Sequence, residues 1–363
     1  MNWLLSYACA WITATLLAAV LTGFCRTLAP RLGLVDRPKN EAHKTHSKAT
    51  PVAGGIGMCL AWLLTLGGGI LVSINVANLL PEEFSFVVPG IRNIWKNLLL
   101  ITACATLITL VGIVDDRKPM RAGKKFFLQF VIAAVTATWG PRLTLGISNQ
   151  FICWIITVLW IMTVINALNF FDNMDGLAGG AAMIAAMYLL LIASIREQHF
   201  VAMLAAATGG TALGFLFHNR PPAKIFMGDG GSHFLGYCLA VICILTTFYL
   251  PGESQTFTPV LIPLLVLGIP LFDAVMVVLI RLKNRQPFYI GDNRHISHRF
   301  CKLGISRPYA VLLVCLLCFS SGAGAVTLLW LPPAGACVIF AQTGAMLAVI
   351  SIIQFILPEG KQP

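Results

Sequence analysis

The sequence predicts an all-α integral membrane protein, a single bundle of about eleven transmembrane helices that occupies residues 1–363. Only 11% of the residues are charged and 58% are hydrophobic, whereas a soluble globular domain carries about 25% charged residues. Apolar runs long enough to cross a hydrocarbon core, about 20 residues each, also follow one another along the whole chain. Backbone groups in lipid must be bonded within their own helix, so these runs are predicted to be helices. This composition excludes a water-soluble enzyme, a disordered chain and a coiled coil.

The predicted helices can be placed in order from the charged and Pro/Gly-rich breaks between them. The first run has no basic residue before it and Arg26 after it, so we expect a retained helix with its N-terminus outside rather than a signal peptide. The fourth run is short, and only Pro332, Pro333 and Gly335 separate the last two, which leaves ten crossings as an alternative. The eleven runs are residues 3–24, 52–73, 97–114, 125–139, 151–170, 177–195, 200–217, 232–250, 258–280, 308–331 and 335–357.

The net charge of +11 is concentrated on one side of this predicted bundle. All but four of the 25 Lys and Arg residues lie in the C-terminal tail or in or beside the loops near 25–51, 115–124, 171–176, 218–231 and 281–307. The positive-inside rule makes that side cytoplasmic, so the charge needs no nucleic acid as a partner. Eight acidic residues share the same side although topology does not require them there: Asp36, Glu41, Asp115, Asp116, Asp172, Asp175, Asp229 and Asp292.

The first acidic motif is the pair Asp115 and Asp116, where an apolar helix ends. Two adjacent carboxylates repel each other unless they share a cation or a proton. The alternative is a solvated helix end balanced by Arg117, Lys118 and Arg121.

The second motif repeats a polar residue every third position, at Asn166, Asn169, Asp172 and Asp175. This spacing predicts a polar stripe at the cytoplasmic end of a helix. Such residues in an apolar helix usually face a cavity or a partner, so we expect a substrate-facing role for them, Asn166 included. The alternative is a structural stripe in which the Asn side chains link helices.

The third motif is Gly228-Asp229-Gly230-Gly231-Ser232. Glycines beside a carboxylate let a ligand approach the backbone closely, and Ser232 could cap a helix whose N-terminus attracts phosphate. As a bare pattern it is also a common turn.

The fourth motif is a basic segment that contains His295, His298 and Arg299. Guanidinium groups bind phosphate oxygens bidentately, so this segment suits a pyrophosphate or a nucleotide. The alternative is a polybasic loop held by anionic lipid headgroups. Lys48 and Lys125 add cations at two helix starts.

Together these motifs predict phosphoryl transfer at the cytoplasmic membrane surface. Carboxylates clustered with cations on one face suit a divalent metal and polyanionic substrates, and Mg²⁺ commonly binds through one or two carboxylates and substrate phosphates. A zinc site is disfavoured because no His/Cys cluster has a suitable spacing. Mn²⁺ is an alternative ion.

The motifs D-D-R, N-A-L-N-F-F-D-N-M-D-G-L, F-H-N-R-P-P-A-K-I-F-M-G-D-G-G-S and D-N-R-H-I-S-H-R resemble those of the polyprenyl-phosphate N-acetylhexosamine-1-phosphate transferases, glycosyltransferase family 4. The resemblance implies a multi-pass enzyme of the bacterial cytoplasmic membrane. It implies transfer of a sugar 1-phosphate from a UDP-N-acetylhexosamine to undecaprenyl phosphate, with release of UMP.

The resemblance also implies roles for individual residues. Asp229 and Asn169 would hold Mg²⁺, Asp172 and Asp175 would line the pyrophosphate site, and Asp115 or Asp116 would lie near the lipid phosphate. Asn219 would contact the uridine side. The phosphates would be held by Lys48, Lys125, His295, His298 and Arg299.

The H-I-S-H-R segment is closer to the family pattern of enzymes that use UDP-GlcNAc than to that of phospho-MurNAc-pentapeptide transferases. This favours the start of a surface glycan such as O-antigen or teichoic acid over peptidoglycan lipid I. Two residues depart from the family pattern: Ser297 stands where a histidine is usual, and Asn173 where a glycine is usual. Whether the protein forms a homodimer, and whether transfer takes one step or two through an aspartyl-phosphate, is left open.

Two other functions remain as alternatives. An ion-coupled transporter would place its ion site near the membrane midplane, and Asp273, an acid inside an apolar run, either braces the site or marks a transport path. An inactive scaffold of the same fold is the third possibility.

Overall fold

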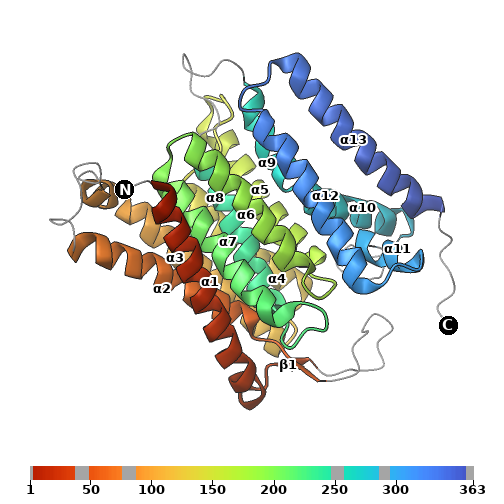
Figure 1. Cartoon of the computed structure of the whole chain (residues 1–363), viewed down its shortest axis with the longest axis horizontal. Helices are drawn as coiled ribbons and strands as arrows, with labels where there is room; N and C mark the ends of the chain where they lie inside the picture. The colour runs from red at the N-terminus through yellow and green to blue at the C-terminus, as the bar shows by residue number, and fades with distance from the viewer. Residues whose placement is uncertain (1–2, 37–48, 76–86, 247–256, 286–294, 357–363) are drawn as a thin grey trace.

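The computed structural model describes residues 3–36, 49–75, 87–246, 257–285 and 295–356, and it is a helical bundle (Figure 1). Its only described strands, β1 (Val35–Asp36) and β2 (Thr50–Pro51), form one short antiparallel pair. The helices are α1 (Trp3–Leu28), η1 (Ala29–Leu32), α2 (Gly54–Asn75), α3 (Val87–Arg117), α4 (Ala122–Trp139), α5 (Gln150–Phe171), α6 (Leu177–Ile195), α7 (His199–Asn219), α8 (Gly228–Leu245), η4 (Thr258–Leu261), α9 (Ile262–Val266), α10 (Gly268–Lys283), α11 (Ile296–Lys302), α12 (Arg307–Thr327) and α13 (Pro333–Ile356).

The predicted multi-pass membrane architecture is confirmed. Each of the eleven predicted runs contains helix in its described part, and nine described helices are long and apolar enough to cross a membrane. A bent pair, Thr258–Val266 followed by Gly268–Lys283 at 68°, makes ten if it is one span. The predicted fourth crossing is α4, which has 18 residues with Lys124 and Lys125 near its start and is not among the nine.

The structure differs from the prediction in three elements. Helix α3 begins at Val87 rather than near 97. Its first turns contain Arg92 and Lys96, and charged residues of this kind end an apolar run without ending the helix. The run at 258–280 is divided at Leu267, beside Gly268 and Pro270, and proline removes a helix hydrogen bond. The basic segment after α10 contains the short helix α11, which has no apolar run to reveal it.

Helix α8 lies at the centre of the bundle, where it packs against α2, α3, α5, α6 and α7. In its most apolar stretch 83% of the residues are buried. The corresponding share is 11% for α13, at the outer edge of the bundle (Figure 1). Glycines allow this close packing: a Cβ on Gly112 of α3 would lie 2.3 Å from the nitrogen of Gly230, and a Cβ on Gly55 of α2 would lie 2.3 Å from that of Gly231. Small residues of this kind let membrane helices approach one another closely.

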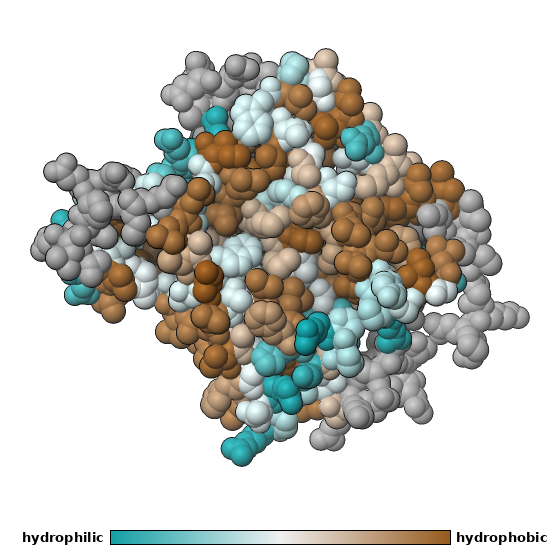
Figure 2. Space-filling model, viewed as in Figure 1, coloured by the Kyte–Doolittle hydropathy of each residue, from teal (hydrophilic) through white to brown (hydrophobic). Residues whose placement is uncertain are grey.

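From α3 to α8 successive helices run in opposite directions, so the predicted site loops between them alternate and meet at one end of the bundle (Figure 1). We call this the site end: α3, α5 and α7 finish there, and α4, α6 and α8 begin there. Figure 2 shows an apolar surface over the middle of the visible face, with hydrophilic residues gathered towards its lower edge. The start of α2 is held there too, since Gly54 and Gly55 donate backbone hydrogen bonds to Phe226 and Met227 just before α8.

Candidate active site

The N-terminus of α8 is capped by a carboxylate from another helix. The backbone N–H groups of Asp229 and Gly230 donate to Oδ1 and Oδ2 of Asp116, at 2.8 and 3.1 Å. A carboxylate at this position satisfies unpaired helix N–H groups and offsets the positive end of the helix dipole. Gly228 must be glycine here, because its φ is +67° and a Cβ would lie 2.4 Å from Oδ2 of Asp116.

Asp115, the neighbour of Asp116, points into a charged cluster instead. Its Oδ2 lies 3.1 Å from Nζ of Lys125, which also forms an ion pair with Oδ2 of Asp229. Its Oδ1 accepts the backbone N–H of Met120 at 2.5 Å. The side chains of Asp115, Lys125 and Asp229 are 12%, 17% and 25% exposed, so a ligand can reach the cluster. The structure thus separates the two adjacent carboxylates, which the sequence could not do.

The asparagines of α5 reach α8 and α4. Nδ2 of Asn169 donates to Oδ1 of Asp229 at 2.7 Å and to Oγ of Ser232 at 2.9 Å. One turn earlier, Nδ2 of Asn166 donates to Oε1 of Gln129 at 2.8 Å. Asn169 therefore belongs to the charged cluster, and Asn166 to a buried polar layer beside it.

That polar layer contains two residues that sequence reasoning missed as site residues, Gln129 and His233. Nε2 of Gln129 lies 3.2 Å from Nε2 of His233, and both side chains are fully buried. Helical spacing in the sequence could have identified them as neighbours of the site. Gln129 follows Lys125 by four residues, and His233 follows Asp229 by four. Residues four apart share a helix face.

The turn between α5 and α6 carries the next two predicted carboxylates. Asp172 ends α5, and burial raises its pKa to about 8, with the negative charges of Asp229, Asp116 and Asp175 adding to the shift. Oδ2 of Asp175 accepts the backbone N–H of Ala223 at 2.9 Å. Asp175 therefore ties this turn to the loop before α8.

Asn219 reinforces the same connection. Its Oδ1 accepts the N–H of Gly176 at 2.8 Å and its Nδ2 donates to the carbonyl of Ile225 at 2.9 Å. The side chain is buried and both ends of its amide are engaged within the protein. A contact between Asn219 and uridine remains a prediction.

Three of the predicted basic residues, His295, His298 and Arg299, lie on or beside α11. Nδ1 of His295 lies 2.6 Å from Oδ2 of Asp273, whose Oδ1 accepts the N–H of Ile296 at 2.8 Å. Asp273 thus holds the start of α11. Burial lowers the pKa of His298 to about 4, and the nearby His295 and Arg307 contribute, so this imidazole is neutral at pH 7.

One of the predicted phosphate ligands, Lys48, lies outside the described residues. The others fall into two groups: Lys125 joins Asp115, Asp229 and Asn169, while Arg299 and the histidines lie on or beside α11. A hydrogen bond of 2.6 Å between Ser297 and Asn173 connects α11 to the turn that carries Asp172.

The charged cluster is suited to a divalent cation. In the described part of the chain, no three His, Cys, Asp or Glu side chains converge as a metal site. Mg²⁺ needs fewer protein ligands, because one or two carboxylates and substrate phosphates suffice. The ammonium group of Lys125 between Asp115 and Asp229 shows that this position attracts a cation. Beside this cluster, burial raises the pKa of Asp172, and the negative charges of Asp229, Asp116 and Asp175 add to the shift.

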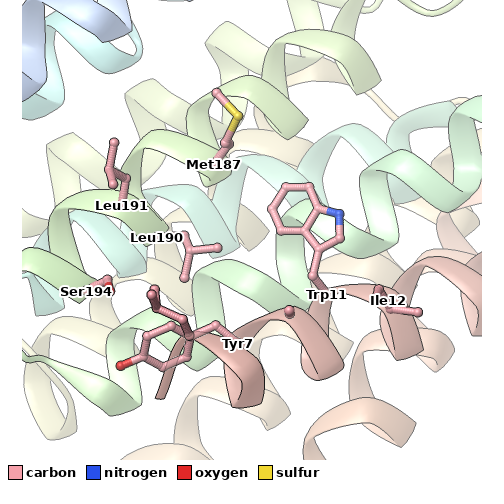
Figure 3. Close-up of a pocket in the computed structure, with 9 residues that line it drawn as sticks. Tyr7, Trp11, Ile12, Met187, Leu190, Leu191 and Ser194 are labelled. Atoms are coloured by element: carbon pink, nitrogen blue, oxygen red, sulfur yellow. The ribbon is translucent and has the colours of Figure 1, made fainter. Parts of the chain in front are cut away.

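A separate pocket lies between α1 and α6 (Figure 3). Its lining residues include Tyr7, Trp11, Leu190 and Leu191, and no charged side chain is among the described residues that line it. It also reaches Ser194, at the end of α6 remote from Asp175. This pocket therefore has neither the charge nor the location for phosphate chemistry.

Comparison with known proteins agrees with the geometry. Residues 98–247, which include α4 to α8 and most of α3, match glycosyl transferase family 4. A probable undecaprenyl-phosphate N-acetylglucosaminyl 1-phosphate transferase of Bacillus subtilis (strain 168) is 30% identical over 327 residues, 88% of this chain and 84% of the relative. A decaprenyl-phosphate N-acetylglucosaminephosphotransferase of Mycobacterium leprae is 28% identical, over 89% of this chain and 83% of the relative. An undecaprenyl-phosphate alpha-N-acetylglucosaminyl 1-phosphate transferase of Escherichia coli (strain K12) is 25% identical, over 86% and 81%.

Proposed function

Because this chain belongs to glycosyl transferase family 4, we propose that it transfers N-acetylglucosamine 1-phosphate from UDP-N-acetylglucosamine to undecaprenyl phosphate and releases UMP. The observation that carries this proposal is the cluster in which Lys125 bridges Asp115 and Asp229 beside Asn169. It combines oxygen ligands for a cation with a positive charge for a phosphate, at one end of a membrane protein. The relatives are named for polyprenyl phosphates and N-acetylglucosamine phosphate, which supports both substrates.

Asp229 and Asn169 would hold Mg²⁺, with Mn²⁺ as an alternative. A bound divalent ion supplies positive charge that offsets the charge developing on the diphosphate and on departing UMP. Asn169 already orients Asp229 by donating to its Oδ1. Asp116 fixes the same residue from the other side, through the backbone N–H of Asp229.

In the direct route, an oxygen of the lipid phosphate attacks the β-phosphorus of the UDP-sugar. The bond between that phosphorus and the bridging oxygen of UMP breaks in the same step. Phosphoryl transfer depends mainly on positioning and electrostatic stabilisation. Lys125 supplies a cation beside the reacting phosphates, and Asp115 orients the lipid phosphate or accepts its proton.

The same comparison supports a sugar for the donor. The relatives are named for N-acetylglucosamine, which supports UDP-GlcNAc. The start of a surface glycan such as O-antigen or teichoic acid stays a prediction. Transfer of phospho-MurNAc-pentapeptide is the alternative within the family. Ion-coupled transport has no comparable support, because both carboxylate oxygens of Asp273 are engaged by His295 and Ile296.

We place the enzyme in the bacterial cytoplasmic membrane, with the site end facing the cytoplasm. The basic residues around that end support this orientation by the positive-inside rule. Assembly as a homodimer remains a prediction.

The decisive experiment is a UMP-release assay with purified protein, undecaprenyl phosphate and Mg²⁺. UDP-GlcNAc, UDP-GalNAc and UDP-MurNAc-pentapeptide are compared as donors. We expect turnover with UDP-GlcNAc, loss of activity in EDTA, and loss in Asp229→Asn. Activity retained by Asp229→Asn would refute the metal assignment. Preference for UDP-MurNAc-pentapeptide would show that the enzyme makes lipid I instead. UMP exchange into UDP-GlcNAc without lipid acceptor would support the two-step route.

A further inference from the structure

One hydrogen bond joins the acidic and basic halves of the site. Oγ of Ser297 donates to Oδ1 of Asn173 at 2.6 Å, across 124 residues of sequence. Ser297 lies in the first turn of α11 and is only 1% exposed, so the donor end of this bond is shielded from water, whereas Asn173 is half-buried. Asn173 follows Asp172 directly and Ser297 precedes His298 directly. The bond therefore links the neighbours of two ionisable groups.

The acceptor, the side-chain amide of Asn173, is also held by a second hydrogen bond. Nδ2 of Asn173 donates to the carbonyl of Phe170 at 3.1 Å, which turns Oδ1 of the same amide towards Ser297. Phe170 belongs to the last turn of α5. The orientation of the Asn173 amide thus follows from the end of α5.

The start of α11 is also anchored from α10. Asp273 accepts hydrogen bonds from His295 and from the N–H of Ile296, and it is itself 1% exposed. Arg281, also on α10, lies over the ring of Phe170 at 5.4 Å, so α10 packs close to the end of α5. Attachment at two points, Asp273 and Asn173, prevents the first turn of α11 from rotating relative to the acidic turn.

We propose that Asn173 and Ser297 are positioning residues for the donor substrate. Their hydrogen bond sets the separation between Asp172 and the α11 residues His298 and Arg299, and so the space that receives the diphosphate of the UDP-sugar. This inference rests on the proposed function. The two side chains, a hydroxyl and an amide, do not titrate in the neutral pH range. The contact therefore keeps the same charge throughout the neutral pH range.

The test is a double-mutant cycle with Ser297→Ala, Asn173→Ala and the double variant. Loss of one neutral hydrogen bond is worth about 1 kcal/mol, so we expect KM for UDP-GlcNAc to rise about fivefold in each single variant. The kcat and the KM for undecaprenyl phosphate should stay within about twofold of wild type. The double variant should be little worse than either single variant, because both remove the same contact. Ser297→Thr, which keeps the hydroxyl, should have a KM for UDP-GlcNAc close to that of wild type.

Ser321→Ala is the matched control. Its hydroxyl is buried and donates to the carbonyl of Leu265 at 2.7 Å, between α12 and α9 and apart from the charged cluster. This variant loses an equivalent bond and should lower the thermal midpoint without changing the KM for UDP-GlcNAc. An equal KM rise in Ser321→Ala would mean that general destabilisation explains the effect, which overturns the positioning role.

Thermal midpoints measured without substrate separate this inference from the proposed function. Additive midpoint losses in the cycle would overturn the contact itself. Non-additive losses combined with an unchanged KM would overturn the positioning role and leave the proposed function standing. Absence of UMP release by the wild-type protein with every UDP-sugar would overturn the proposed function, whatever the midpoints are.

Discussion

At the scale of single residues, Asp115 and Asp116 show how adjacent identical side chains take different positions. They follow each other at the end of α3, so their side chains leave the helix in different directions. Asp116 uses both oxygens on the backbone of α8, whereas Asp115 contacts Lys125 and the N–H of Met120. We therefore expect Asp116 to stabilise the fold and Asp115 to serve the reaction.

Alanine at each of these positions tests the division. Asp116→Ala leaves two helix N–H groups without their acceptor, which should lower the free energy of unfolding by about 1–3 kcal/mol. Asp115→Ala leaves only the N–H of Met120 without its acceptor, so it should lower the thermal midpoint less than Asp116→Ala does. It should lower kcat on the order of a hundredfold, the usual effect of losing a group that orients or deprotonates a substrate. Thermal unfolding and UMP release report the two effects separately. Equal midpoint losses in both variants would contradict the assignment.

Asp172 makes the stability of the metal-free protein depend on pH. Burial and neighbouring carboxylates raise its pKa to about 8, whereas an aspartate in an unfolded chain titrates near 3.9, approximately. Between these values the folded protein retains a proton that the unfolded chain has released. The free energy of unfolding should therefore fall as the pH rises from about 4 to about 8.

This pH dependence can be measured as the thermal midpoint in EDTA across that range. Asp172→Asn cannot ionise, so it should remove this part of the slope. Mg²⁺ favours the ionised carboxylate and should reduce the slope in the wild-type protein. A slope in Asp172→Asn as steep as that of wild type would show that other groups control it.

At the scale of elements, α8 matters most because it carries Asp229 and lies inside the bundle. Its first turn is bordered by α2 and α3 at contacts that leave no room for a Cβ. The position of Asp229 is therefore set by backbone packing as much as by its own hydrogen bonds.

Two glycines of α2 provide a matched test. A Cβ on Gly55 would meet the backbone of α8 at 2.3 Å, whereas a Cβ on Gly67 would meet nothing within 4 Å. Gly55→Ala should therefore cost about 1–3 kcal/mol of stability through overpacking, and it should reduce activity by displacing Asp229. Gly67→Ala should leave UMP release unchanged. Wild-type activity in Gly55→Ala would show that α8 tolerates the shift.

At the scale of the whole molecule, the described parts of the predicted site loops lie at one end of the bundle (Figure 1). Antiparallel helices of similar length bring alternate loops together, so motifs more than a hundred residues apart can share one site. The apolar pocket between α1 and α6 (Figure 3) reaches Ser194, at the end of α6 away from the site end.

The orientation of this end is testable by cysteine labelling. Lys118 is exposed between α3 and α4 at the site end, and Ser148 is exposed between α4 and α5 at the other end. In intact spheroplasts a membrane-impermeant maleimide should add label to Ser148→Cys above the background of the native cysteines, and none to Lys118→Cys. Inside-out vesicles should reverse the pattern. Labelling of Lys118→Cys in spheroplasts would place the site outside.

The sequence by itself determined the membrane class and the helical runs, and it predicted the residues that meet in the charged cluster. Hydrophobic length and spacing are properties of a local stretch of chain. Runs such as 177–195 and the stripe from Asn166 to Asp175 can therefore be recognised without knowledge of the fold. Helix α11 could not be predicted in this way, because it is short and polar and has no apolar run.

Only the tertiary structure decided which partner each polar group takes. It assigned Asp116 to α8 and Asp115 to Lys125, engaged the amide of Asn219 internally, and joined Ser297 to Asn173. These contacts connect residues far apart in sequence, and they depend on helix rotation and on glycine-controlled approach. Neither quantity is encoded in the periodicity of a single helix, because each is settled only when neighbouring helices pack.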